Sequence, residues 1–138
     1  MKDFAQTIPT YDDVVAAHER IKPYIHRTPV LTSSFLNDLT GAELFFKCEN
    51  LQKVGAFKYR GATNAVQSLD AKTAARGVAT HSSGNHAQAI AKAAQLLGVP
   101  AYIVMPSNAP RAKVDAVKAY GGIITFCEPN LQAREDTL

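Results

Sequence analysis

Cysteine is scarce in this sequence, and its two residues, Cys48 and Cys127, have no C-x-x-C spacing. Both lie inside apolar runs, LFFKCE and IITFC, which favours reduced, buried thiols over a disulfide framework or a zinc site. The four histidines also lack the spacing of metal ligands. We therefore expect no metal centre in this chain.

Positive charge is not concentrated along the chain, although the formal net charge is +3. The densest cationic cluster, Lys53, Lys58 and Arg60, is interrupted by uncharged residues, and a nucleic-acid surface normally carries a denser patch. No apolar run approaches membrane-spanning length, and the N-terminal residues MKDFAQTIPT lack the apolar core of a signal peptide. We expect a cytoplasmic protein without a nucleic-acid or membrane partner.

Short apolar runs alternate with amphipathic segments through most of the chain. Strands are predicted at 77–81, 101–105 and 123–127, and helices at 59–69, 85–97 and 110–121, with another starting at residue 131. This alternation predicts right-handed βαβ units, and therefore an α/β fold whose parallel sheet has helices on both faces. Ligands collect at the carboxyl ends of the strands in such sheets, and the first of these ends is the richest in polar side chains.

The first fifty residues follow a different pattern. A helix is predicted after Thr10, which can act as its N-cap, with Asp12 and Asp13 in the first turn. Pro23 limits how far this helix can run, and an apolar run at 44–48 predicts a strand. We therefore divide the chain into an N-terminal helix with a connector, residues 1–50, and an α/β domain, residues 51–138.

Lys58 lies in the segment VGAFKYRG, at the opening of a predicted helix. The positive end of the helix dipole disfavours an ammonium there, which should lower the pKa of Lys58 and raise the fraction of free amine. A lysine that forms a Schiff base needs such an amine, and the flanking Gly55 and Gly61 would let the backbone approach a planar ligand. An ordinary exposed lysine at a loop–helix junction accounts for the segment equally well.

A second polar segment, Ser82, Ser83, Gly84, Asn85 and His86, follows a predicted strand and opens a helix. Two hydroxyls, free backbone N–H groups and a helix N-terminus together make an anion-binding site. A serine N-cap with glycine in a tight turn is the simpler alternative, but a cap needs only one of these residues. The segment matches neither G-x-G-x-x-G nor G-x-S-x-G, which disfavours a dinucleotide site and a serine hydrolase.

Together, ENLQKVGAFKYRG at 49–61 and HSSGNHAQ at 81–88 resemble the serine/threonine dehydratase and serine racemase family of fold-type II pyridoxal-phosphate (PLP) enzymes. The resemblance runs from TPVLTSS near the start to AYIVMPSNAPRAKVDAVKAYGG and CEP near the end. Its two core motifs are highly specific in combination, and we identify the chain as a member of this family on that basis.

The resemblance implies a role for each residue of the two motifs. Lys58 would form a Schiff base with pyridoxal 5'-phosphate and later move the Cα proton of a small amino-acid substrate. Phe57 would border the cofactor ring, and Asn85 would bond the phenolic oxygen of the cofactor. The loop from Ser82 to His86 would bind the substrate carboxylate.

The residue type at position 83 differs between two groups of enzymes in this family. Dehydratases dedicated to threonine often carry alanine at this position, whereas racemase-like members carry serine. The resemblance therefore implies that Ser83 is a second acid/base on the cofactor face opposite Lys58, as two-base racemisation requires. Dehydration needs only Lys58 and protonation of the leaving hydroxyl, so the motif favours a serine racemase-like enzyme that also dehydrates serine or threonine.

Members of this family are longer than 138 residues, and the eight scattered glycines form no loop that could cradle the cofactor phosphate. We expect an incomplete smaller domain, with residues 1–50 packing on a larger domain and the whole enzyme assembling as a homo-oligomer. A β-replacement enzyme such as a cysteine synthase is a weaker candidate, because its asparagine loop usually differs after Asn85. The alternative from another class is a non-catalytic remnant that binds an anion or a partner chain.

Overall fold

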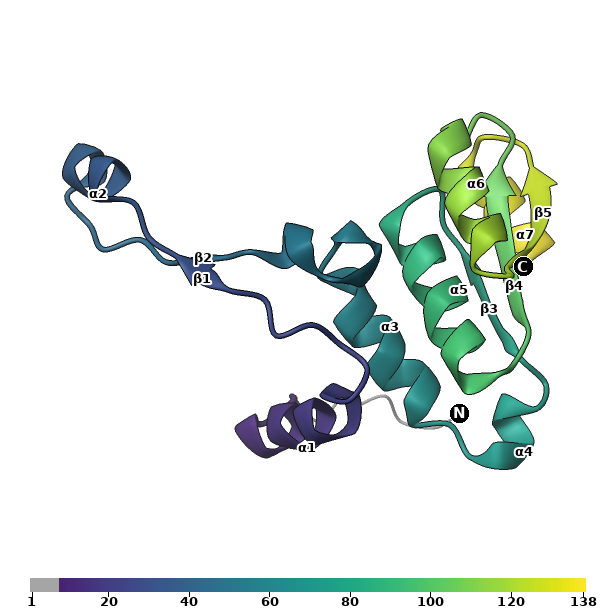
Figure 1. The fold of residues 1–138 in the computed structure, drawn as a ribbon. Coiled ribbons are helices and arrows are strands. Elements are labelled where there is room, and N and C mark those ends of the chain that lie inside the picture. The colour runs from purple at the N-terminus through teal and green to yellow at the C-terminus, as the bar shows by residue number, and fades with distance from the viewer. Residues whose placement is uncertain (1–7) are drawn as a thin grey trace.

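The computed structural model describes residues 8–138 (Figure 1). Its α-helices are α1 (Tyr11–Ile21), α2 (Ser34–Thr40), α3 (Lys58–Gln67), α4 (Ala71–Ala74), α5 (Asn85–Leu97), α6 (Arg111–Ala119) and α7 (Leu131–Thr137). Its strands are β1 (Val30–Leu31), β2 (Phe46–Lys47), β3 (Val78–His81), β4 (Ala101–Pro106) and β5 (Ile123–Cys127), and two 3-10 turns lie at Glu49–Leu51 and Lys53–Gly55. Residues 1–7 lie outside this description. The expectation that the N-terminal segment contains no signal peptide concerns mainly these residues, so it stays a prediction.

Three parallel strands form the main sheet in the order β3-β4-β5. Thr80 lies opposite Ile103, and Ile103 lies opposite Ile124, so these three side chains point to the same face of the sheet. Each strand is followed by a helix, as the alternating sequence pattern predicts. The predicted α/β fold with a parallel sheet is therefore confirmed.

Helix α5 lies between the sheet and α3 (Figure 1). Its buried positions are mainly alanines, and Ala87, Ala91 and Ala94 are fully enclosed. Because these side chains are short, α3 can approach α5 closely on one side while Ile103 packs from the sheet on the other. The position of the α3 N-terminus relative to the α5 N-terminus is thereby fixed by packing.

Gly122 lies just before β5, where α5 and α6 come together. A Cβ atom at this position would lie 2.6 Å from Cγ1 of Val117 and 3.3 Å from Cβ of Ala91. Both neighbours are fully buried, so neither can move away. The two helices can therefore lie this close to β5 only because Gly122 has no side chain.

The other face of the sheet is covered less completely. Helix α7 contacts β4 and β5, and Val104 is buried on this side. Tyr102, earlier in the same strand, and Ile123, its neighbour on β5, remain about half exposed. Helices thus pack on both faces, but the second face keeps an open apolar area.

Strands β1 and β2 pair antiparallel and form an arm with α2 at its tip (Figure 1). The strand predicted at 44–48 is correct only for Phe46 and Lys47, because β1 offers a partner to these two residues alone. The sequence analysis missed α2, which begins after the Ser33 cap and ends at Gly41 in a left-handed conformation. Phe35 on this helix is 72% exposed, so the arm presents apolar side chains that no other part of residues 8–138 covers.

The expectation that both thiols are buried is wrong. Cys48 lies at the base of the arm and Cys127 at the end of the edge strand β5, and both are only partly enclosed. Their sulfurs donate to nearby backbone carbonyls, that of Phe46 and that of Met105 respectively. Both cysteines are free, as the sequence predicts.

Helix α1 begins at the predicted cap. The Thr10 hydroxyl accepts from the Asp13 backbone N–H at 3.3 Å, and the Asp13 carboxylate accepts from the Thr10 N–H at 2.7 Å, which lowers the pKa of Asp13. The helix ends at Ile21, before Pro23, and Arg20 holds it to Asn64 of α3.

The division of the chain at residue 50 stays a prediction. No helix within residues 8–138 combines the length and apolar character that crossing a bilayer demands.

Candidate functional site

Lys58 is the first residue of α3 and follows a tight turn. Val54 and Gly55 both have positive φ angles, 57° and 67°, which reverses the chain before the helix begins. Such a φ is a strained conformation for a β-branched residue, so the turn must be held by its surroundings. Phe57 and Lys58 emerge from this turn exposed to solvent, with the Lys58 ammonium 5.3 Å from the centre of the Phe57 ring.

An ion pair anchors α3 in its first turn. Arg60 donates from Nε and Nη2 to the two carboxylate oxygens of Glu49, at 2.8 and 2.7 Å, and Thr28 donates its hydroxyl to the same carboxylate at 2.6 Å. The Arg60 hydrogen bonds, helped by Thr28 and by the charges of Arg60 and Lys47, outweigh burial and lower the pKa of Glu49 to about 2. This pair fixes the helix that carries Lys58 to the segment before it.

The turn itself is closed by Gln52, which is almost fully buried. Its side-chain oxygen accepts from the His26 N–H at 2.9 Å, and its side-chain nitrogen donates to the His26 carbonyl at 2.8 Å. The Gln52 carbonyl also accepts from the Gly55 N–H at 2.8 Å. One glutamine therefore joins the connector after α1 to the turn that precedes Lys58.

The loop from Ser82 to His86 leaves β3 and opens α5. The Ser82 N–H donates to the Val104 carbonyl at 3.0 Å, and the Ser82 hydroxyl accepts from the Gly84 N–H at 3.3 Å. The residue before the helix, Gly84, has no side chain to cap it. The first backbone N–H groups of α5 are therefore left without intrahelical partners, which is the arrangement that binds anions at helix N-termini.

The two predicted motifs lie next to each other in space. Burial lowers the pKa of His86, and the positive charges of Lys58 and His81 lower it further. Helices α3 and α5 pack against each other, and the turn at Lys53–Gly55, which precedes α3, also contacts α5. The N-termini of α3 and α5 are therefore neighbours, although the roles of Phe57, Ser83 and the other residues of both motifs stay predictions.

Asn85 has a partner that the sequence analysis missed. Its side-chain oxygen accepts a hydrogen bond of 2.7 Å from the ammonium of Lys113 in α6. The two residues are 28 positions apart and meet because α5 and α6 pack side by side. No local motif in the sequence signals this contact.

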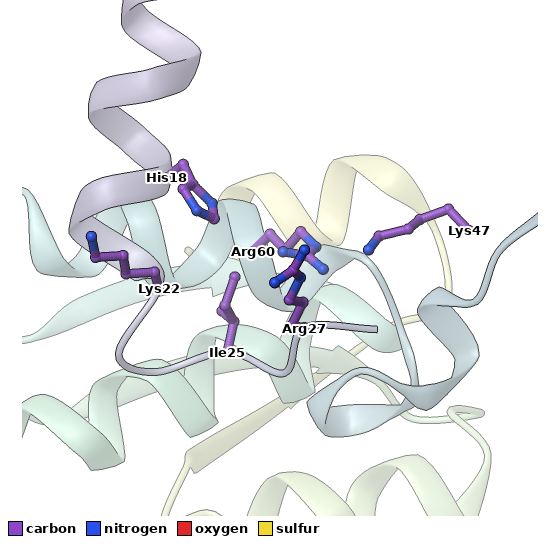
Figure 2. Close-up of a pocket in the computed structure, with 6 residues that line it drawn as sticks. All are labelled: His18, Lys22, Ile25, Arg27, Lys47 and Arg60. Atoms are coloured by element: carbon purple, nitrogen blue, oxygen red, sulfur yellow. The ribbon is translucent and has the colours of Figure 1, made fainter. Parts of the chain in front are cut away.

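A cavity of about 770 Å³ lies elsewhere, between α1, the connector and α3 (Figure 2). It is lined by His18, Lys22, Ile25, Arg27, Lys47 and Arg60, and Figure 2 shows Arg27, Arg60 and Lys47 directed toward one another. None of the predicted site residues lines it. We assign the candidate site to the α3 and α5 N-termini, because the reactive side chains are there, rather than to this basic cavity.

Among the residues that the structure describes, no three His, Cys, Asp or Glu side chains gather as a metal ion would need. The two neighbouring helix N-termini instead carry an amine, an aromatic ring, an amide, two hydroxyls and free N–H groups. These suit an organic ligand that carries a carbonyl and negatively charged oxygens.

A family of proteins described as pyridoxal-phosphate dependent enzymes matches residues 21–138. This chain belongs to that family. It is 65% identical over 130 residues to the β-hydroxyaspartate dehydratase of Paracoccus denitrificans, covering 94% of this chain and 41% of the relative. It is 63% identical over 120 residues to the serine racemase of Arabidopsis thaliana, covering 87% of this chain and 36% of that relative.

Comparison with solved structures also finds a PLP-dependent relative. The fold superimposes on part of maize serine racemase with a TM-score of 0.89 and 52% identity, over 91% of this chain and 38% of that one. The predicted membership of the PLP family is confirmed, together with its racemase and dehydratase relatives. The chain spans about 40% of the length of the relatives that it matches.

Members of the family use PLP, and the described residues fit part of that cofactor. Lys58 presents an exposed amine for its aldehyde, Phe57 presents an exposed ring beside that amine, and Asn85 keeps a free amide NH₂. These 138 residues contain no glycine-rich tract that could cradle the phosphate. These residues could therefore hold the reactive edge of the ring.

Proposed function

We propose that this chain supplies the lysine side of a PLP-dependent enzyme that racemises or dehydrates serine or threonine. The observation that carries the proposal is that Lys58 and the loop from Ser82 to His86 lie at the N-termini of two helices that pack against each other, and that α5 has no side-chain cap. An amine next to an anion-binding helix end suits an amino acid whose carboxylate is held at the helix while its Cα faces the lysine. The names of the matched relatives support the same reaction class.

In this proposal the two motifs divide the work. The loop from Ser82 to His86 binds the substrate carboxylate through its hydroxyls and the N–H groups of α5, which orients the Cα–H bond. Lys58 removes the Cα proton, and Ser83 exchanges a proton on the opposite face when the product is the mirror-image amino acid. Bound PLP supplies the electron sink that makes this proton acidic.

A second substrate class is supported by a specific observation. The relative with 65% identity is named a β-hydroxyaspartate dehydratase, and 3-hydroxyaspartate carries the same β-hydroxyl leaving group as serine and threonine. We therefore extend the proposal to hydroxyaspartate. Parallel assays of pyruvate, 2-oxobutyrate and oxaloacetate formation from the three amino acids would rank these substrates.

The experiment that tests the proposed function is reductive trapping. The chain is incubated with PLP and reduced with borohydride, and the modified lysine is located by mass spectrometry. We expect the adduct on Lys58, its loss in Lys58→Ala, and its survival in Lys72→Ala, which removes an exposed lysine from α4. A wild-type chain that forms no adduct would instead favour the non-catalytic remnant, and an adduct spread evenly over surface lysines would argue against a built site.

A further inference from the structure

The hydrogen bond between Lys113 and Asn85 points to a residue that prepares the site. We infer that Lys113 is a positioning residue, which fixes the amide of Asn85 so that its NH₂ group faces the phenolic oxygen of the cofactor. This inference rests on the proposed function. It starts from a 2.7 Å contact between a half-buried lysine in the first turn of α6 and the first residue of α5.

The chemistry of the two groups decides the orientation of the amide. An ammonium has three donors and no acceptor, so only the side-chain oxygen of Asn85 can lie against it. Turning the amide over would place the NH₂ group against the ammonium, with donors facing donors. The free end of Asn85 is therefore a donor, which complements an oxygen that carries negative charge.

The charge of Lys113 also strengthens the donor at the other end of the amide. A cation on the carbonyl oxygen polarises the amide and makes its N–H groups better donors. Among the described residues Lys113 has no carboxylate within 4 Å, so its charge is not neutralised by an ion pair. Lys113 and the N-termini of α5 and α6 together make the surroundings of Asn85 positive.

Helix stability does not account for the position of Lys113. A lysine in the first turn lies at the positive end of the helix dipole, where a cation is disfavoured. Lys118, in the last turn of the same helix, lies where a cation is favoured. A lysine that is poorly placed for its own helix but bonded to a site residue is better explained by its effect on Asn85.

The orientation can be tested without cofactor, by NMR of the Asn85 side-chain NH₂ group. Lys113→Met keeps the length of the side chain but removes its donors, and Lys118→Met is the matched control on the same helix. We expect the Asn85 signals, assigned with Asn85→Asp, to move in Lys113→Met and to stay in place in Lys118→Met. Unchanged Asn85 signals in Lys113→Met would overturn the inference.

The effect on the cofactor is tested by PLP binding to the same variants. We expect the dissociation constant for PLP to rise about tenfold in Lys113→Met, as for the loss of one charge-assisted hydrogen bond. Lys113→Arg should restore most of the affinity because it keeps a donor, and Lys118→Met should bind as the wild type does. The melting temperature of Lys113→Met should not fall, which separates this effect from misfolding.

The outcomes distinguish this inference from the function on which it rests. If the wild-type chain binds PLP and Lys113→Met binds equally well, Lys113 does not act on the cofactor and the inference is wrong. If the wild-type chain forms no adduct on Lys58, the proposed function fails together with the cofactor part of the inference. The NMR measurement then still decides whether Lys113 orients the amide.

Discussion

The position of Lys58 is set by residues that have no reactive role. Gln52 closes the turn before it, and the Arg60–Glu49 pair holds the helix after it. The side chain itself is exposed and makes no hydrogen bond with the described residues, so it is free to react. A reactive residue that is held only through its backbone can be replaced without loss of the fold, which makes substitutions at this scale informative.

Ser83 should matter more for racemisation than for dehydration, because only racemisation needs a second base. In the proposed enzyme, Ser83→Ala should reduce conversion of L-serine to D-serine at least a hundredfold, within the usual size of a general acid–base contribution. Pyruvate formation should fall by less than tenfold. Chiral chromatography and a pyruvate assay on the same sample would measure both rates.

Ser107→Ala is the matched control, because Ser107 follows the neighbouring strand β4 and is exposed. It should change neither rate. Equal loss of both activities in Ser83→Ala would contradict the two-base assignment and leave Ser83 as a residue that binds substrate.

Glu49 should contribute stability that depends on pH. Its pKa is about 2 in the folded protein against an ordinary value of 4.5, so the stabilisation is fully present above pH 4.5 and is lost as the pH falls toward 2. Glu49→Gln should lower the free energy of unfolding by about 2 kcal/mol at pH 7, since the pair is partly exposed to water. Urea unfolding at pH 7 and at pH 3 would measure the change.

The difference between wild type and Glu49→Gln should shrink at pH 3, where part of the advantage of the carboxylate has been lost. Glu43→Gln is the control, because Glu43 is exposed and has no hydrogen-bond partner among the described residues. A Glu49→Gln protein as stable as wild type at pH 7 would show that the pair does not hold α3.

At the scale of elements, the sequence predicts the bounds of a helix or strand where residues within or beside that element determine them. The helix at 85–97 has the predicted bounds, because Gly84 and Gly98 flank it and its apolar spacing is regular. The strand at 44–48 is shorter than predicted, because the length of a strand depends on its partner. Helix α2 has a local signal at each end, a serine cap at Ser33 and a glycine at Gly41, but its seven residues are too few to show a clear apolar period.

In the candidate site, too, the features set by local sequence were predictable and those set by packing were not. Both motifs could be found in the sequence, and the order of strands and helices placed one of them at a sheet edge. The contact between Lys113 and Asn85 could not be predicted, because it depends on how two helices pack across the molecule. The basic cavity of Figure 2 was missed for the same reason, since its lining comes from α1, the connector, β2 and α3.

The packing of α5 should tolerate no larger side chain at Ala91. This residue is fully buried and lies against Gly122, so leucine has no space to fill. We expect Ala91→Leu to lower the free energy of unfolding by about 2 kcal/mol, in the range found for overpacked cores. Thermal and urea unfolding would check this.

Gln95→Leu introduces the same side chain one turn later, at an exposed position of α5. It should change the stability by less than 0.5 kcal/mol, as is usual for surface substitutions. A similar loss in both variants would mean that helix propensity rather than packing sets the stability of α5.

On the scale of the whole molecule, apolar surface is distributed unevenly. Phe35, Leu39 and Phe45 on the arm, Val14 on α1, and Ile123 on the open face of the sheet are all at least half exposed. Large exposed apolar side chains of this kind often mark surfaces that another domain or chain covers. The predicted larger domain and homo-oligomer would cover these surfaces, and both stay proposals.

The 138-residue chain by itself should therefore self-associate and turn over substrate poorly. Sedimentation velocity should show a weight-average mass that rises with concentration, and serine-to-pyruvate turnover should be weak because no phosphate cradle is present in these residues. Replacing Phe35 and Leu39 with serine should reduce association, whereas replacing Lys72 with serine should not. A monomer with full turnover would contradict both expectations.

The close contact at Gly122 has a consequence for how this sequence can vary. Any side chain at this position collides with Val117 and Ala91, so glycine is required for folding whatever the protein does. Lys58 is the opposite case, because nothing in the fold needs its side chain. In a mutant library selected only for soluble expression, survivors should keep Gly122 and lose Lys58, whereas selection of the whole proposed enzyme for growth that requires its product should retain both. The positions that differ between the two sets of survivors would then map the chemistry of the protein separately from its architecture.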